Sequence, residues 1–103
     1  DVLRRHLREG DLAVRMGGEE FAVLLQGMHT SAAQAVAERL RNDLARLAAQ
    51  RTGLPITASL GVALATPGTD FAALWRQADG ALYRAKTQGR NRVECASAPE
   101  GTP

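Results

Sequence analysis

The chain has 103 residues, of which 45% are hydrophobic and 23% are charged, a composition typical of one soluble globular domain or part of one. Its 13 basic and 11 acidic residues leave a net charge of only +2, which argues against a protein that binds nucleic-acid polymers. The single cysteine, Cys95, excludes an internal disulfide and favours a reducing compartment, and no stretch has the roughly 18 apolar residues of a membrane span.

The first expected element is a helix over residues 1–9 that ends at Gly10. No start signal precedes it, so it is interpreted as the end of a longer helix. Strands are expected over residues 12–16 and 21–25, because apolar side chains alternate in both. Gly17 and Gly18 lie between them and predict a tight hairpin turn, since glycine reaches the positive φ angles that such turns require.

A helix and a third strand are expected after the hairpin. Ser31 and Gln34 have the spacing of a capping box, which predicts a helix that begins at the serine and runs to about Gln50. Residues 56–65 then alternate bulky and small side chains. This pattern predicts a strand with another element packed closely over its small side.

A second helix is expected after Asp70, whose side chain can cap it. The expected buried stripe consists of Phe71, Leu74, Ala78, Ala81, Leu82 and Ala85. Residues 90–95 are expected to form a last strand, and the polar residues 96–103 a flexible tail, so that the domain covers residues 1–95. The predicted fold class is α+β, with an antiparallel-containing sheet covered by helices mainly on one side.

The hairpin sequence GGEEF, residues 17–21, also contains residues suited to binding a ligand and a metal ion. Two glycines allow a ligand to approach the backbone closely, because no Cβ atom intervenes. Glu19 and Glu20 offer hard oxygen ligands of the kind that Mg²⁺ prefers. The residues alone favour an ordinary Gly-Gly hairpin flanked by solvated glutamates, because hairpin turns with charged neighbours are common.

Three segments together resemble the GGDEF domains, the diguanylate cyclase family. These are GGEEF at 17–21, ITASLGVA at 56–63 with the family's S-x-G pattern, and ADGALYRAKTQGRNRV at 78–93, which is similar to AD-x-ALY-x-AK-x-x-GRN-x-V. The resemblance identifies the chain as the C-terminal portion of such a domain. It implies a nucleotide-cyclase or ferredoxin-like palm that lacks its N-terminal βα part, and therefore a sheet with a missing central strand and exposed edges.

The resemblance also implies an activity. Such domains condense two GTP molecules into cyclic di-GMP and release two pyrophosphates, and the reaction requires a homodimer in which each domain holds one GTP. Glu19 and Glu20 would be the catalytic carboxylates and would bind two Mg²⁺ or Mn²⁺ ions per site. They are expected to converge because they lie at the turn, while Gly17 and Gly18 leave room for the nucleotide.

Two further groups of residues gain a role from the resemblance. Lys86 and Arg90 match residues that contact the terminal phosphates, although without the family they would be interpreted as cations that complement a helix C-terminus. Arg8 and Asp11 have the RxxD form and spacing of an inhibitory site for cyclic di-GMP, and Arg39 matches another arginine of that site. An arginine fork suits phosphate or guanine, and a carboxylate suits the guanine edge.

The same resemblance predicts the molecular context. The parent protein is expected to be cytoplasmic or anchored to the inner membrane, with an N-terminal sensory or receiver domain. The chain alone is expected to be nearly inactive, because guanine-recognition residues and a further metal-binding aspartate lie outside it. The alternatives are a non-catalytic cyclic di-GMP receptor and a dimerisation module, and the intact GGEEF sequence favours the enzyme.

Overall fold

The computed structural model of the chain describes residues 5–96. Its elements are β1 (Leu12–Gly17), β2 (Glu20–Gln26), α2 (Thr30–Thr52), β3 (Ser59–Ala65), α3 (Phe71–Thr87) and β4 (Val93–Cys95). Of the expected first helix, Arg5 and His6 are helical, and residues 1–4 lie outside the described part. Of the expected tail, only Ala96 is described, and its N–H still donates to the Val62 carbonyl at 2.7 Å.

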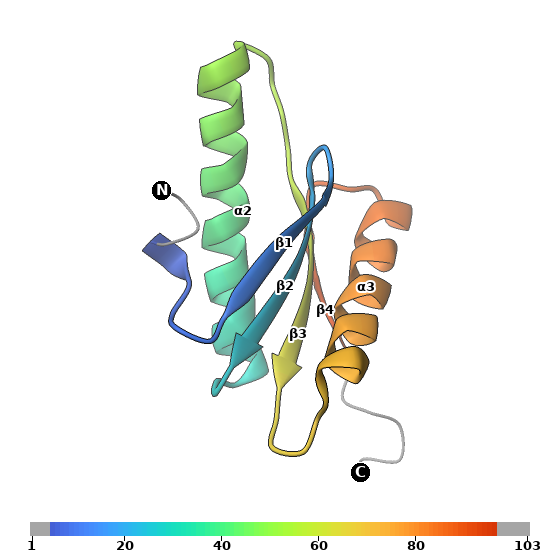
Figure 1. The fold of residues 1–103 in the computed structure, drawn as a ribbon. Helices are drawn as coiled ribbons and strands as arrows, with labels where there is room; N and C mark the ends of the chain where they lie inside the picture. Colours follow the sequence, from blue (N-terminus) through green and yellow to red (C-terminus); the bar gives the residue numbers. More distant parts are fainter. Residues whose placement is uncertain (1–4, 97–103) are drawn as a thin grey trace.

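The four strands form one sheet in the order β1-β2-β3-β4 (Figure 1). β1 and β2 are antiparallel, whereas β2, β3 and β4 run parallel to one another. β2 and β3 pair directly from Glu20–Ser59 to Gln26–Ala65. β2 and β3 satisfy each other's backbone groups, so the expected exposed edges do not arise at these two strands. Among residues 5–96, the edge strands of the sheet are β1 and β4.

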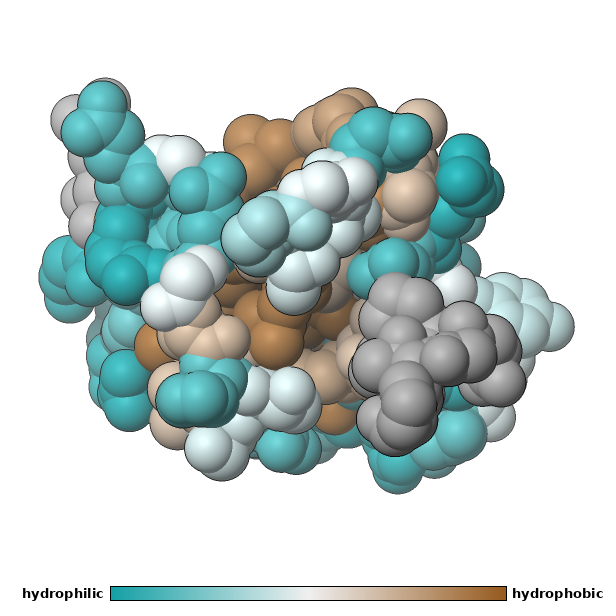
Figure 2. All heavy atoms as spheres, turned by 90° about the horizontal axis from the view of Figure 1, so that it is seen from below, coloured by the Kyte–Doolittle hydropathy of each residue, from teal (hydrophilic) through white to brown (hydrophobic). Residues whose placement is uncertain are grey.

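The sheet is covered on both faces, with α2 on one side and α3 on the other (Figure 1), so the expected one-sided arrangement is also wrong. Successive strand residues point to opposite faces, and both faces of the central strands are apolar. Val23 and Leu25 pack in the cluster that includes Leu40 of α2. Ala22 and Leu24 pack instead against Leu74 and Ala78 of α3. Seen from the lower end of Figure 1, apolar side chains occupy the middle of the molecule (Figure 2).

α3 lies directly on the small-residue side of β3, which confirms that prediction. A Cβ atom at Gly61 would lie 2.2 Å from the Leu82 nitrogen and 2.4 Å from the Ala78 carbonyl oxygen. Asp70 caps α3 as expected, because its Oδ1 accepts a hydrogen bond from the Ala73 N–H at 2.7 Å. Phe71, however, is 61% exposed: it stacks on Trp75 at the start of the helix and does not enter the core.

α2 differs from its predicted bounds at both ends. It begins at Thr30, and its N-cap residue is His29, whose side chain makes no capping hydrogen bond. Ser31 is therefore a residue of the first turn and not the cap. At the other end the helix continues to Thr52 and stops at Gly53, which adopts the left-handed conformation with φ 74°.

The last two strands are shorter than predicted. β3 begins at Ser59, so residues 56–58 form an approach to the sheet. β4 begins at Val93 because Arg90 and Asn91 have positive φ angles, 62° and 49°, which no strand residue adopts. Within residues 5–96, neither helix is long and apolar enough to span a membrane.

Candidate functional site

The hairpin turn consists of Gly18 and Glu19, with Gly17 paired to Glu20 across the strands. The pairing register shifts between Arg15 and Gly17, and such a bulge bends the strand into the turn. Neither glycine has a positive φ angle, so the prediction that the turn needs glycine for such an angle is wrong. A Cβ at Gly17 would lie 2.8 Å from the Glu20 Oε1, whereas a Cβ at Gly18 would meet nothing within 4 Å.

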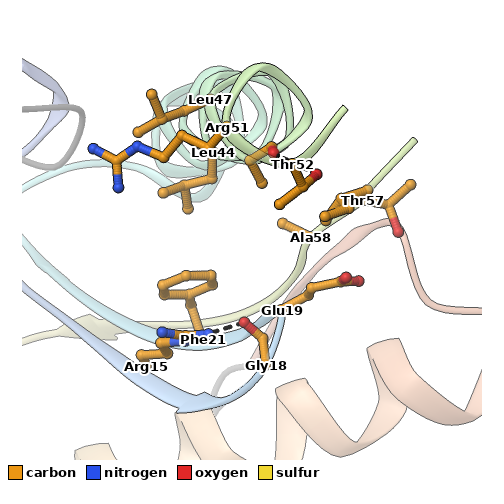
Figure 3. A pocket seen from close by; sticks show the side chains of 12 residues that line it. Arg15, Gly18, Glu19, Phe21, Leu44, Leu47, Arg51, Thr52, Thr57 and Ala58 are labelled. Atoms are coloured by element: carbon orange, nitrogen blue, oxygen red, sulfur yellow. Dashed lines mark hydrogen bonds between the residues drawn. The ribbon is translucent and has the colours of Figure 1, made fainter. Parts of the chain in front are cut away.

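Arg15 holds the turn from within β1. Its Nε donates hydrogen bonds to the carbonyl oxygens of Gly17 and Gly18, at 3.2 Å and 3.0 Å. The hydrogen bond to Gly18 is drawn in Figure 3. No ligand or turn contact is predicted for Arg15 from the sequence. Its position two residues before a double glycine was the available signal, because a side chain there can reach back to the turn carbonyls.

Glu20, Lys86 and Arg90 come together at the start of β2. The Glu20 carboxylate accepts a hydrogen bond from Arg90 Nη1 at 2.7 Å, and its other oxygen lies 3.5 Å from Lys86 Nζ. The hydrogen bond from Arg90 lowers the pKa of Glu20, and the positive charges of Lys86 and Arg90 also lower it, against the opposing effect of burial. The carboxylate is therefore ionised at neutral pH, between two cations that both belong to the α3–β4 region.

Glu19 faces the other side of the sheet. It lines a pocket of about 290 Å³ between the hairpin and α2 (Figure 3). The apolar residues of this pocket are Phe21, Leu44, Leu47, Ala48, Ile56 and Ala58. Glu19 and Glu20 thus do not converge, because neighbouring residues at the start of β2 already point to opposite faces of the sheet.

This geometry bears on the expected metal ions. Among residues 5–96, no group of three histidine, cysteine, aspartate or glutamate side chains is placed to hold a metal ion. Glu20 is engaged by Arg90 and Lys86, and Glu19 lies on the opposite face. The described residues therefore do not form a site for Mg²⁺ or Mn²⁺ by themselves.

The RxxD residues lie at the opposite end of β2 from this cluster. Asp11 accepts hydrogen bonds from the backbone N–H groups of Arg8 and Gln26, at 2.9 Å and 3.0 Å, and its side chain is only 1% exposed. The Arg8 guanidinium is 57% exposed and contacts Asp11 at 3.5 Å as well as the Gln26 carbonyl. Arg39 is exposed on α2, and in the described part of the chain no hydrogen bond or ion pair joins it to Arg8 or Asp11.

Comparisons with known proteins show the family of this chain. Residues 1–92 match the family described as diguanylate cyclase, GGDEF domain. The chain is 38% identical over 98 residues to the probable diguanylate cyclase DgcT of Escherichia coli K12, which covers 90% of the chain and 22% of that protein. It is 42% identical over 96 residues to the diguanylate cyclase DgcP of Pseudomonas aeruginosa, which covers 91% of the chain and 14% of that protein.

A solved structure shares the fold. The GGDEF domain of DgcB from Caulobacter crescentus, crystallised in complex with c-di-GMP, superimposes with a TM-score of 0.67 at 31% identity, over 94% of this chain and 60% of that one. The chain belongs to the GGDEF family. It spans less than a quarter of the length of the two curated relatives, and its mixed four-stranded sheet with two helices corresponds to part of the palm of the solved domain.

Proposed function

We propose that this chain is the phosphate-binding part of a GGDEF domain that condenses two GTP molecules into cyclic di-GMP. In each half-reaction the 3′-hydroxyl of one GTP attacks the α-phosphate of the other, a new O–P bond forms, and pyrophosphate leaves. Two half-reactions in a homodimer close the ring and release two pyrophosphates. The family match over residues 1–92 and the similarity to proteins named diguanylate cyclases support this proposal.

The observation that carries the proposal is the convergence of Lys86 and Arg90 on one carboxylate. The pair already holds an anion, the Glu20 side chain, at 3.5 Å and 2.7 Å. Arg90 remains 59% exposed, so its guanidinium can offer further donors to a ligand, and such a fork matches a phosphate group. The two cations would bind the terminal phosphates and stabilise charge that develops on the leaving pyrophosphate.

The remaining hairpin residues have proposed roles around this site. Glu19 and Glu20 would act as the catalytic carboxylates, Glu20 beside the cationic pair and Glu19 on the opposite face of the sheet. Gly17 and Gly18 would admit the nucleotide close to the backbone. Any Mg²⁺ or Mn²⁺ site would need ligands in addition to these two glutamates. We also propose that guanine recognition comes from residues other than those described, so that the 103-residue chain alone turns over little GTP.

A hybrid enzyme tests this proposal. The segment of the Caulobacter DgcB GGDEF domain that corresponds to this chain is replaced by the chain, and cyclic di-GMP formation from GTP is measured. We expect an active hybrid that loses roughly 100-fold or more of its rate on Arg90→Ala, because a preorganised donor to the transition-state charge is removed. Lys86→Ala should act in the same direction.

The matched control is Arg76→Ala, which removes an exposed arginine from the same helix. It should leave the rate unchanged. A hybrid whose rate survives Arg90→Ala would refute the phosphate role. A folded but inactive hybrid would favour a non-catalytic module of a signalling protein.

A second proposed function is binding of the product cyclic di-GMP near Arg8. The solved GGDEF domain of DgcB is a complex with c-di-GMP, and the exposed Arg8 guanidinium here lies beside a carboxylate. Because Asp11 is committed to two backbone N–H groups, we propose that it shapes the turn while Arg8 supplies the charged contact. Arg39 on α2 would be a further contact.

Calorimetric titration of cyclic di-GMP into the chain separates these roles. Arg8→Ala should abolish binding and leave the melting temperature almost unchanged. Asp11→Asn should lower both the affinity and the free energy of unfolding, the latter by about 1 kcal/mol or more, because one carboxylate acceptor of a backbone N–H is replaced. Unchanged affinity in Arg8→Ala would contradict the product site. Absence of binding to the unsubstituted 103-residue chain would favour a dimerisation module.

A further inference from the structure

The loop from Gln88 to Arg92 holds an unusual backbone conformation. Arg90 and Asn91 both lie in the left-handed region, with φ angles of 62° and 49°, where a Cβ atom crowds the backbone and only single residues are usually found. Two consecutive residues of this kind persist only when their surroundings hold them in place. The loop directly precedes β4 and carries the guanidinium that contacts Glu20.

Three elements supply those restraints. The end of α3 binds the loop through the Arg90 N–H, which donates to the Ala85 carbonyl at 2.8 Å. β3 binds it through Ser59, whose Oγ accepts a hydrogen bond from the Asn91 N–H at 3.0 Å. α2 binds it through Arg41, whose guanidinium donates to the Asn91 Oδ1.

Ser59 is conspicuous among these groups. It is 3% exposed and is the one polar residue among the buried residues of the described part of the chain. A buried hydroxyl is costly unless it is hydrogen-bonded, and the Asn91 N–H is the partner that it has here. An alanine would fill nearly the same space in an apolar strand, so packing alone does not explain a serine at this position.

We propose that Ser59 is a positioning residue for the phosphate site: by holding the Asn91 N–H, it fixes the left-handed Arg90–Asn91 pair and so places the Arg90 guanidinium at the start of β2. Arg41 supports the same loop from α2 through the Asn91 side chain. This inference rests on the proposed phosphate role of Arg90. It adds that the affinity of the site depends on a hydroxyl in β3 that touches no phosphate.

A double-mutant cycle tests the inference, with inorganic pyrophosphate titrated into the 103-residue chain and binding followed by amide chemical shifts. Ser59→Ala should weaken binding by about two- to tenfold, the effect of one hydrogen bond. In the Arg90→Ala background, Ser59→Ala should have no further effect, because it acts through that guanidinium. Ser31→Ala, an exposed serine of α2, is the matched control and should not change the affinity.

A second pair of variants does not depend on the folding of Ser59→Ala. Asn91→Gly and Asn91→Ala both remove the contact with Arg41, but only glycine tolerates a φ of 49° without a Cβ penalty. Asn91→Ala should therefore bind pyrophosphate about fivefold more weakly than Asn91→Gly. Equal affinities of these two variants, or an equal effect of Ser59→Ala with and without Arg90, would overturn the positioning role. Equal pyrophosphate affinities of the unsubstituted chain and of Arg90→Ala would instead overturn the proposed phosphate site.

Discussion

Glu20, which the sequence singles out as a candidate site residue, has other partners in the structure than those expected. The sequence paired it with Glu19 as two adjacent metal-binding carboxylates. In the structure its carboxylate contacts Lys86 and Arg90, which come more than sixty positions later in the chain. Opposite charges at such short range stabilise the ionised carboxylate, so the site is electrostatically ordered before any ligand binds.

This pairing predicts how the stability of the chain depends on pH. The pKa of Glu20 is lowered from its ordinary value of 4.5, so its contribution to stability is complete above about pH 4.5 and is lost as the pH falls through the lowered folded value. Arg90→Ala should raise the pKa of Glu20 more than Lys86→Ala does, because the hydrogen bond from Arg90 is its largest cause. Carbon-detected NMR titration of the Glu20 carboxyl measures both shifts. A Glu20 titration that is unaltered in Arg90→Ala would show that the ion pair does not form in solution.

At the scale of elements, the contact between β3 and α3 decides the architecture. Gly61 allows the backbone of α3 to touch the strand, with Leu82 and Ala78 closer than any side chain would permit. The conflict at Gly61 involves backbone atoms of a helix, which cannot move aside as the tip of a flexible side chain can. The small side of the strand is therefore a requirement of helix–sheet packing.

Two glycine substitutions separate this packing effect from backbone propensity. Gly61→Ala should lower the free energy of unfolding by about 1–3 kcal/mol, the usual cost of overpacking a core. Gly80→Ala, in the middle of α3 where a Cβ meets nothing within 4 Å, should raise it by about 1 kcal/mol through helix propensity. Urea unfolding followed by circular dichroism measures both. A neutral Gly61→Ala would show that α3 does not pack this closely.

The short parallel pairing of β3 with β4 is the other informative element. A strand is predicted over residues 90–95, yet only Val93–Cys95 pair with β3. Local pattern could not reveal the left-handed Arg90 and Asn91, because the restraints on them come from Ser59 in β3 and Arg41 in α2.

At the scale of the whole molecule, the chain is a helix–sheet–helix sandwich whose two ends carry different chemistry. One end of β2 holds the hairpin, Glu20 and the cationic pair. The other end is tied to the N-terminal turn by Asp11, which binds the Gln26 N–H. His6 adds a contact between this turn and α2 through Asp43, at 2.6 Å, and the hydrogen bond from His6 lowers the pKa of that aspartate.

Much of the fold and of the candidate site could be predicted from local information. Alternating side chains located β1, β2 and β3, and the cap at Asp70 located α3. The GGEEF and GRN segments indicated the family and the residues of the proposed phosphate site. These signals are encoded by neighbours in sequence, because strand period, helix period and capping are properties of short segments.

Tertiary structure decided what depends on long-range contacts. The direct pairing of β2 with β3, the helix on each face of the sheet and the exposure of Phe71 follow from which apolar surfaces meet. The separation of Glu19 from Glu20, the capture of Glu20 by Lys86 and Arg90, and the link from Ser59 to Asn91 likewise arise only when distant segments are brought together. The sequence determined which residues carry charge and hydrogen-bonding capacity, and the packing of the elements determined their partners. The reason is that the interaction energy of two side chains depends on the distance between them, and a local sequence pattern does not specify distances between remote segments.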